Sequence, residues 1–299
     1  MTRREALVWL GTMSGSLLLT SPVRALSRLR PVRAFSPRLR AVQISDIHHG
    51  YRGVGNPDPA ASVDRALALV KRLRPDVLLV SGDLIEADRA VRVRERRLHE
   101  VWERLTALGT PLLAVPGEQD ALMDRGSLWK QVVGPLHFHE EVRGVHVIGL
   151  DNVSRGYFLG SSERRWLFDV LDGIPRDSPV LMMAHAPLAW FYPPWNWYTY
   201  DGPAAATLLK RFPHHLFIHG HVHQVLTDAV AGIGGLGARA VSFAYPLPDR
   251  QQPVPLRPLP MPDENRNDGL GVRLIEFSER FRVTDHPLAE PVILGARTD

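Results

Sequence analysis

The sequence contains no cysteine and very few lysines, and the first absence excludes several kinds of chemistry. Without cysteine the chain has no disulfide, no thiolate metal site, no cysteine nucleophile and no lipoprotein attachment site. Any bound metal must be held by imidazole and oxygen ligands, which suit Mn, Fe or Zn. Only three of the 36 basic residues are lysine, which we interpret as genome composition rather than function.

Positive charge is concentrated at the N-terminus. Residues 1–40 hold eight Arg and one Glu, so the formal net charge of +4 conceals a net charge of −3 on the rest of the chain. Nucleic-acid binding needs clustered basic residues on the folded body. We therefore predict no nucleic-acid partner. The 299 residues, 44% of them hydrophobic, fit one large globular domain or two small ones.

The first 25 residues resemble an export signal. Arg3 and Arg4 precede a weakly apolar stretch that ends near Leu19, and the small residue Ala25 follows it, as in a twin-arginine signal. We expect a signal over 1–25, an Arg-rich linker over 26–39, a main domain over 40–299, and a location in the periplasm or on the outer face of the cytoplasmic membrane. The alternatives are a chance Arg pair and an apolar stretch retained as an anchor, although its length of about 15 residues is short for a membrane span.

Short apolar runs bounded by turn residues are typical of buried strands. They occupy residues 39–44, 77–80, 111–115, 180–184 and 216–218. Helical patterns cover 58–73, 86–108 and 162–171, the last with Ser161-Ser162-Glu163 as an expected N-terminal cap. This alternation favours a mostly parallel sheet. After Ala238 we expect antiparallel strands that close a second sheet, at 240–244, 271–277 and 281–284.

Each of the five apolar runs is followed by residue types that bind metals. The segments are Asp46-Ile47-His48, Gly82-Asp83, Gly117-Glu118-Gln119-Asp120, His185 and Gly220-His221-Val222-His223. Polar residues just past such strands lie on the rim where α/β sheets hold ligands. Side chains two residues apart share one side of an extended segment, so Asp46 and His48 can reach one metal, and Asp83 behind Gly82 can reach between two. A pair of metals about 3.5–4 Å apart can bind phosphoryl oxygens.

In this order and spacing, the five segments resemble those of the calcineurin-like metallophosphoesterase family, over residues 40–285. The resemblance implies an α/β fold, a two-sheet β-sandwich flanked by helices in four αββα layers. It also implies a phosphatase, phosphodiesterase or diphosphatase whose nucleophile is a metal-bridging hydroxide. In that family's pattern, Asp46, His48 and His223 bind one metal with Asp83 bridging. His185, His221 and residue 118 bind the second. Exported members led by an Arg pair resemble this chain most in layout.

The third segment departs from the family pattern at two positions. Glu118 stands where Asn is usual, and Gln119 stands where a phosphate-contacting His is usual. Glu118 can still bind a metal through oxygen, whereas Gln119 can donate a hydrogen bond but cannot transfer a proton. Loss of a general acid costs about 10²–10⁴-fold, mostly for poor leaving groups. We expect Asp120 to support the site by accepting from a ligand histidine or a backbone donor. The alternative function is a catalytically weakened protein that binds phosphorylated ligands through its metals.

Residues 190–200 hold seven aromatic side chains, and Pro193-Pro194 prevents a regular helix or strand there. The segment starts five residues past His185, so we expect Trp190, Trp195 and Trp197 to form a lip for the substrate. Membrane contact and plain packing are the alternatives. The expected partners are a small phosphorylated, lipid-linked or sugar-nucleotide substrate and, peripherally, a membrane. The seven prolines of residues 246–270 predict an extended surface loop or a partly disordered one.

Overall fold

The computed structural model describes residues 38–190, 196–230, 232–246, 257–259 and 269–289, which all belong to one compact unit, Pro37–Asp299. The predicted signal, most of the predicted linker, Trp195 and most of the proline-rich loop lie outside the described residues. Among the helices of the described part, none has the length and apolar character needed to cross a membrane.

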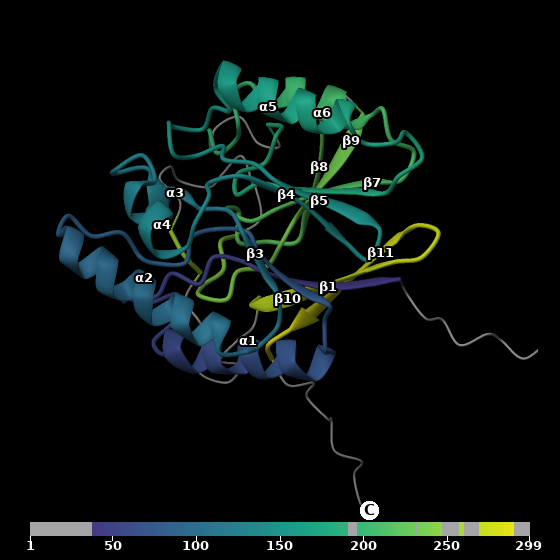
Figure 1. Ribbon diagram of the computed structural model, residues 1–299. Helices are drawn as coiled ribbons and strands as arrows, with labels where there is room; N and C mark the ends of the chain where they lie inside the picture. Colours follow the sequence, from purple (N-terminus) through teal and green to yellow (C-terminus); the bar gives the residue numbers. More distant parts are fainter. Residues whose placement is uncertain (1–37, 191–195, 231, 247–256, 260–268, 290–299) are drawn as a thin grey trace, which may run out of the picture. The chain divides into compact units, whose positions relative to one another are not determined.

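The first sheet has five strands in the order β11-β10-β1-β2-β3. Its strands are β1 (Leu39–Ile44), β2 (Val77–Val80), β3 (Leu112–Ala114), β10 (Gly271–Phe277) and β11 (Phe281–Pro287). The pairs β1–β2 and β2–β3 are parallel, whereas β10 is antiparallel to both β1 and β11. Helices α1 (Pro59–Leu73) and α2 (Val91–Thr106) lie on the outer face of this sheet (Figure 1).

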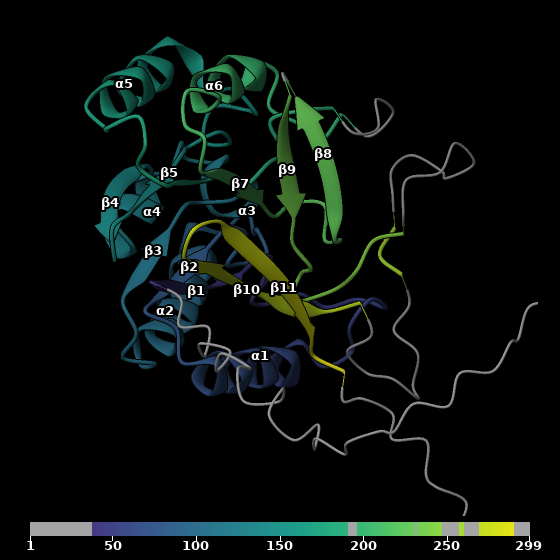
Figure 2. The same ribbon diagram turned by 90° about the vertical axis from the view of Figure 1, so that its right-hand side faces the viewer.

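The second sheet has six strands in the order β4-β5-β6-β7-β9-β8. Its strands are β4 (Phe138–Val142), β5 (Val145–Gly149), β6 (Val180–Met183), β7 (His215–His219), β8 (Leu226–Val230) and β9 (Ile233–Gly237). The four central strands run parallel, and the two edge strands β4 and β8 are antiparallel to their neighbours. Helices α5 (Gly160–Asp172) and α6 (Gly202–Leu209) cover its outer face, as Figure 2 shows from the side.

Alternate residues of each strand enter different apolar clusters, which produces the layers. In β2, Val77 and Leu79 join a core that also contains Leu181 and Met183 of β6, so this core lies between the two sheets. Leu78 and Val80 face the other way and pack with residues of α1 and α2. A third core joins the outer face of the second sheet to α5 and α6. The α/β sandwich of two mixed sheets between helices confirms the fold prediction.

One of the expected helices, α2, begins later than predicted because residues expected in its first turn are held at the site. α1 begins as expected, with Asp58 accepting from the backbone N–H of Ala61 at 3.1 Å. α2 starts at Val91 rather than at residue 86. The backbone N–H of Glu86 donates to His49, and that of Ala87 donates to Gln119, so both are held at the rim of the sheets.

The expected cap of α5 is wrong. The Ser-Ser-Glu segment lies inside the first turn, and no side chain of that turn caps the helix. Instead, the Asp201 carboxylate accepts from the backbone N–H groups of Leu159 and Gly160 at 2.8 and 2.9 Å. A residue 41 positions away in the chain supplies the cap, which a local pattern cannot reveal.

The strands expected after Ala238 differ in two ways from the prediction. Residues 240–244 form no strand, because the N–H groups of Val241 and Ser242 donate to Ser45 and Asp46 in the loop after β1. Strands β10 and β11 are antiparallel as expected, but they extend the first sheet beside β1 rather than closing a second one. Two short helices, α3 (Glu118–Ala121) and α4 (Ser127–Val132), and the hairpins β4–β5 and β8–β9 were not predicted.

Candidate metal centre

All seven residues predicted to bind metals lie together at the carboxyl ends of five strands. The first sheet delivers Asp46 and His48 after β1, Asp83 after β2 and Glu118 after β3. The second sheet delivers His185 after β6, and His221 and His223 after β7. Gln43 links the two sheets directly beneath this rim, because its Nε2 donates to Ser81 Oγ at 2.9 Å and to the carbonyl of His219 at 3.1 Å.

The seven side chains form two donor groups, in each of which the ligand atoms lie within 4.8 Å of one another. The first donor group is Asp46, His48 and His223. The second donor group is Asp83, Glu118, His185 and His221. These are the two sets that the family resemblance implies.

Asp83 lies where the two donor groups meet. Its Oδ2 is 3.4 Å from His48 Nε2 in the first group and 3.5 Å from His185 Nε2 in the second. The Asp83 side chain is almost fully buried. A buried carboxylate equally close to donors of both groups is positioned to share two cations.

The backbone holds five of the seven candidate ligands in the left-handed region. The residues and their φ angles are Asp46 at 53°, His48 at 43°, Asp83 at 51°, His221 at 66° and His223 at 53°. Positive φ is uncommon for residues other than glycine and costs about 1–3 kcal/mol each. Strain of this kind persists only where the surrounding structure fixes it, and it gathers at functional sites. The turns that direct these side chains to one point are therefore part of the site.

The glycines of the expected segments are needed for close approach. A side chain at Gly82, whose φ is +94°, would collide with the His185 ring and the backbone of Gly117. A side chain at Gly117 would collide with the Asp83 carboxylate. Both glycines let the loops after β2, β3 and β6 meet without displacing a candidate ligand.

The outer nitrogens of three histidine rings are anchored by acceptors that the sequence did not reveal. His48 Nδ1 lies 2.9 Å from Glu86 Oε2, His185 Nδ1 lies 2.7 Å from the carbonyl of Ser81, and His223 Nδ1 lies 2.6 Å from the carbonyl of Phe243. An acceptor at Nδ1 fixes the proton there and leaves Nε2 as a free lone pair for a metal. Glu86 has the weakest sequence signal, because it follows Asp83 in a loop that was predicted to be helical.

The charges of the site favour a cation. Burial acts to raise the pKa of Asp46, but the neighbouring histidines, His223 foremost, outweigh it and lower that pKa. Burial likewise acts to raise the pKa of Glu118, and His221 and His185 hold it well below its usual range. Burial acts to lower the pKa of His185, yet the carboxylates of Asp83 and Glu118 raise it well above its ordinary value. Without a metal, this cluster draws a proton to His185.

Three buried polar atoms of the second donor group have no hydrogen-bond partner within the described residues. They are Glu118 Oε2, His185 Nε2 and His221 Nε2. Glu118 Oε2 lies only 2.8 Å from His185 Nε2 and 3.2 Å from His221 Nδ1. Buried polar atoms are almost always satisfied, and each exception needs an explanation. Imidazole and carboxylate donors left open around one point fit a transition-metal cation.

Gln119 and Asp120 support the site in different ways. The Asp120 carboxylate accepts from the backbone N–H groups of Leu84, Ile85 and Gly117 at 3.1, 3.1 and 2.9 Å. It therefore fastens the loops that carry Asp83 and Glu118, through backbone donors rather than a ligand histidine. Burial raises the pKa of Asp120 to about 6. Gln119 is half-buried, and its Oε1 accepts from the Ala87 N–H at 3.2 Å.

Two of the three tryptophans expected at the lip can be placed, and they differ. Trp197 is half-buried, and its ring centroid is 5.4 Å from that of His221 and 5.1 Å from that of Tyr245. Trp190 is 63% exposed and stacks loosely on Tyr198 at 5.8 Å. Trp195 lies outside the described residues. Tyr157 was not predicted, but its ring centroid also lies 5.4 Å from that of His221.

Comparison with known proteins identifies a family and a relative that are similar to this chain. Residues 39–225 match the calcineurin-like phosphoesterase family. A transmembrane protein with metallophosphoesterase domain from Bos taurus is 28% identical over 214 residues, which are 64% of this chain. The chain spans 43% of the length of that relative.

Two solved structures share the fold. A dimetal phosphatase from Danio rerio matches with a TM-score of 0.60 and 14% identity, over 85% of this chain and 98% of the other. GAP50, the anchor in the inner membrane complex of Plasmodium, matches with a TM-score of 0.55 and 12% identity, over 84% of each chain. Because the family match covers more than half of the sequence and includes the segments that converge here, the chain belongs to the calcineurin-like phosphoesterase family.

Proposed function

We propose that the two donor groups hold two cations, Mn, Fe or Zn, and that the protein hydrolyses a phosphoester or diphosphate there. The first donor group takes one cation and the second takes the other, with Asp83 between them. The second donor group carries this assignment, because one ligand atom from each of its four buried or half-buried residues lies within 4.8 Å of the others. Bound cations would polarise the phosphoryl oxygens and supply a nucleophile from water. The chain's own residues set the position of those cations.

Gln119 restricts the range of leaving groups. It follows Glu118 directly. Its Oε1 accepts from the Ala87 N–H, so the side-chain NH₂ group is its remaining hydrogen-bonding group and can only donate. An amide can bind a phosphoryl oxygen but cannot protonate a departing alkoxide. Diphosphates and activated esters, which leave as stable anions, need no such proton. They are the substrates that this site would hydrolyse best.

A panel of phosphoesters and diphosphates assayed with the Mn-loaded protein tests the reaction. We expect turnover of diphosphates and aryl esters, and little turnover of alkyl monoesters. In Gln119→His, hydrolysis of alkyl monoesters should rise by about 10²-fold with metal content unchanged. Gln131→His is the matched control, because Gln131 is an exposed residue of α4.

If neither wild type nor Gln119→His hydrolyses any member of the panel while both bind phosphate-bearing ligands, the chain is a phospho-ligand binding protein. Elemental analysis decides the metal question separately. A purified protein without metal, which also takes up no Mn, Fe or Zn, would overturn the assignment of both donor groups.

The substrate that we propose is a phosphorylated amphiphile, lipid-linked or a sugar-nucleotide derivative, at a membrane surface. Trp197 and Tyr157 line the second donor group, while Trp190 and Tyr200 are 63% and 41% exposed nearby in the same segment. Large exposed aromatic side chains are favourable at an interface that is apolar on one side and wet on the other. The bovine relative is named a transmembrane protein, which agrees with a role at a membrane.

Changing Trp190, Trp195 and Trp197 together to Ala should raise KM for a lipid-bearing phosphoester by about tenfold and spare a small soluble ester. The reason is that remote apolar contacts bind the tail and not the reacting phosphorus. Phe168→Ala is the control, since Phe168 is an exposed aromatic side chain on α5. An equal rise in KM for both substrates would mean that the segment shapes the metal site. No change in KM for either substrate would mean that the segment serves only packing.

We also propose that the protein is exported through its N-terminal signal. Arg3 and Arg4 precede the apolar stretch at the N-terminus, and a protein that acquires its metals before export must cross the membrane folded. Cell fractionation should find the wild type outside the cytoplasm and Arg3→Lys/Arg4→Lys inside it. Equal distribution of the two forms would exclude the twin-arginine route.

A further inference from the structure

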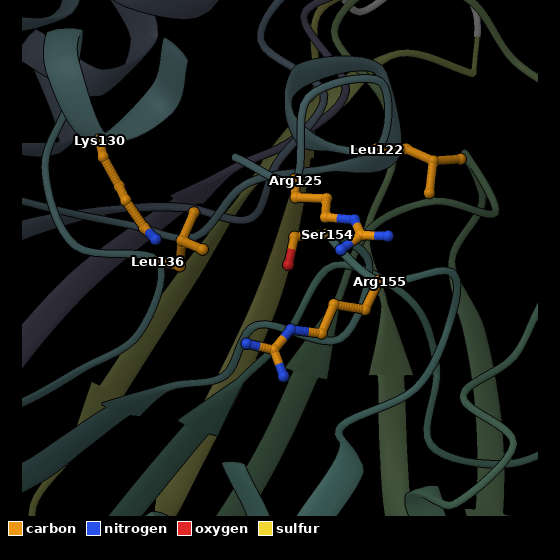
Figure 3. Close-up of a pocket in the computed structure, with 6 residues that line it drawn as sticks. All are labelled: Leu122, Arg125, Lys130, Leu136, Ser154 and Arg155. Atoms are coloured by element: carbon orange, nitrogen blue, oxygen red, sulfur yellow. The ribbon is translucent and has the colours of Figure 1, made fainter. Parts of the chain in front are cut away.

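A cavity of about 650 Å³ opens one helical turn away from Glu118 and is lined by three cationic side chains. Its lining residues are Leu122, Arg125, Lys130, Leu136, Ser154 and Arg155 (Figure 3). A second, smaller hollow of about 420 Å³ shares Lys130, Leu136 and Arg155 with it. The smaller hollow is also lined by the carboxylates of Asp151 and Glu163.

Both walls of the cavity come from segments that contact the second donor group. On one wall, the Leu122 N–H donates to the Glu118 carbonyl at 3.0 Å, so the cavity begins where α3 ends. On the other wall, Arg155 precedes by two residues Tyr157, whose ring lies against His221. The cavity therefore borders the segments that carry the second donor group.

The three cations have no carboxylate partner in the part of the chain that the structure describes. The nearby Asp124 is engaged by Arg94 at 2.7 Å, and Glu163 by His137 at 2.6 Å. Figure 3 shows Arg125, Ser154 and Arg155 on neighbouring parts of the cavity wall, with Lys130 on the opposite side. Asp151, which lines the adjoining hollow, accepts from the backbone N–H and the hydroxyl of Ser154, so none of the three cations is held in an ion pair within the described residues.

The backbone holds Arg125 at this cavity against its own preference. Its φ is 56°, and Gly126 follows with φ 74°, a pair of left-handed residues between α3 and α4. A side chain at residue 126 would collide with Leu136, so the turn is closed around the cavity wall. A non-glycine residue held at positive φ is uncommon and is found where function requires it.

We propose that Arg125, Lys130 and Arg155 bind a second phosphate group of the substrate, beyond the phosphoryl group that is hydrolysed. Two guanidinium forks and one ammonium match the charge and the oxygens of a phosphate dianion, and exceed what a single carboxylate needs. The substrate class is then a molecule with two phosphoryl groups joined by a short spacer. This inference rests on the proposed function, because it takes the second donor group as the place of hydrolysis.

The test measures binding of a series of α,ω-alkane bisphosphonates to the Mn-loaded protein by calorimetry, against alkyl monophosphonates of equal length. At the best spacer length the bisphosphonate should bind about tenfold more tightly, the value of one or two charge-assisted contacts. Arg125→Ala/Arg155→Ala should remove that preference and leave monophosphonate binding unchanged. Arg125→Lys/Arg155→Lys should keep part of the preference, because the charges remain and the forks are lost.

Arg65→Ala, an exposed arginine of α1, is the matched control and should behave as the wild type. Equal affinity for bisphosphonates and monophosphonates at every spacer length would overturn the inference, as would a preference that survives loss of both arginines. Because the ligands are not hydrolysed, the result is separate from turnover. A protein that hydrolyses no phosphoester but prefers bisphosphonates would refute the proposed reaction and keep this site.

Discussion

The two donor groups of the metal centre are built from the same residue types but are held in different ways. In the first group, Glu86 and the Phe243 carbonyl anchor the rings of His48 and His223, and Asp46 accepts from the His221 N–H at 3.1 Å. In the second group, three buried atoms have no hydrogen-bond partner among the described residues. The first group is thus held by anchors on its histidine rings, whose Nε2 atoms face each other at 3.3 Å, whereas in the second group the Glu118 carboxylate itself lies against His185 and His221. The two groups should therefore bind metal with different affinity and respond differently to mutation.

The largest effect is expected at Asp83, which is close to both groups. Asp83→Ala should lower kcat by about 10³-fold or more, because a shared carboxylate positions two cations, and these supply several kcal/mol of transition-state stabilisation. Metal content, measured by elemental analysis, should fall in both groups together. Asp177→Ala is the control, since Asp177 is exposed and outside the site. If Asp83→Ala loses metal from one group only, Asp83 belongs to that group and does not bridge.

A smaller effect should separate the groups. Glu86→Gln should weaken metal binding about 10–100-fold in the first group and leave the second nearly unchanged, because Glu86 fixes the His48 ring. A competition titration with a metal-sensitive chelator resolves the two binding steps. The chain offers a matched control in Glu100→Gln, which breaks a similar 2.9 Å pair with His49 outside the site.

Glu118→Gln is the counterpart and should weaken the second group instead. The substitution replaces a charged oxygen donor, which lies within 3.2 Å of both His185 and His221, with a neutral and weaker amide oxygen. If Glu86→Gln and Glu118→Gln weaken the same binding step, the division into two groups is wrong.

The sequence located the candidate ligands of both groups, which the structure brings together, but not the residues that support them. Asp46, His48, Asp83, His185, His221 and His223 each follow an apolar run within a few residues, so strand order and residue type together locate them. The anchors of the rings are different in kind. Two are backbone carbonyls, Ser81 and Phe243, and any residue type can supply a carbonyl. Glu86 was predicted to lie in a helix. The tertiary contacts of residues 86–90 instead hold this segment outside the helix.

The prediction of the fold from the sequence was limited in the same way as the prediction of the site. Short apolar runs bounded by turn residues predicted β1, β2, β3, β6 and β7, because strands covered on both faces are apolar throughout. The expected strand at 240–244 instead runs along the loop of Asp46, where the Ser242 hydroxyl donates to the Asp46 carbonyl at 2.7 Å. Its apolar residues, Val241 and Phe243, are buried against the first sheet and the His48 and His223 rings. Apolar residues buried against a functional site give the same sequence pattern as apolar residues buried in a strand, so the pattern alone does not distinguish the two.

Raising the pH should change the metal affinity of the two groups to different extents, and this difference should be smaller than that produced by the mutations above. A metal needs the unprotonated Nε2 of a histidine, and the carboxylates Asp83 and Glu118 raise the pKa of His185 well above its ordinary value. Protons therefore compete at His185 above neutral pH, and metal affinity of the second group should rise about tenfold per pH unit. Burial lowers the pKa of His48, so its ring is already neutral and the first group should respond little. Titrations between about pH 6 and pH 8 measure both steps.

Equal pH dependence of the two binding steps would contradict this account. His185→Gln offers a check, because it removes the competing proton. The second step should then become weaker and nearly independent of pH, while the first step keeps its wild-type affinity.

The smallest effect is expected from Trp197, which packs against the second group. Its ring packs against His221 and Tyr245, and a contact between aromatic rings is worth about 0.5–1.5 kcal/mol. Trp197→Ala should therefore weaken metal binding in the second group by about threefold, through a less firmly held His221, and leave the first group unchanged. Trp190→Ala is the control, because Trp190 is in the same segment but stacks on Tyr198. The chelator titration that resolves the two steps decides the outcome. An equal loss in both groups would mean that the aromatic segment supports the whole rim, and the difference between the two donor groups would then lie in their hydrogen bonds alone.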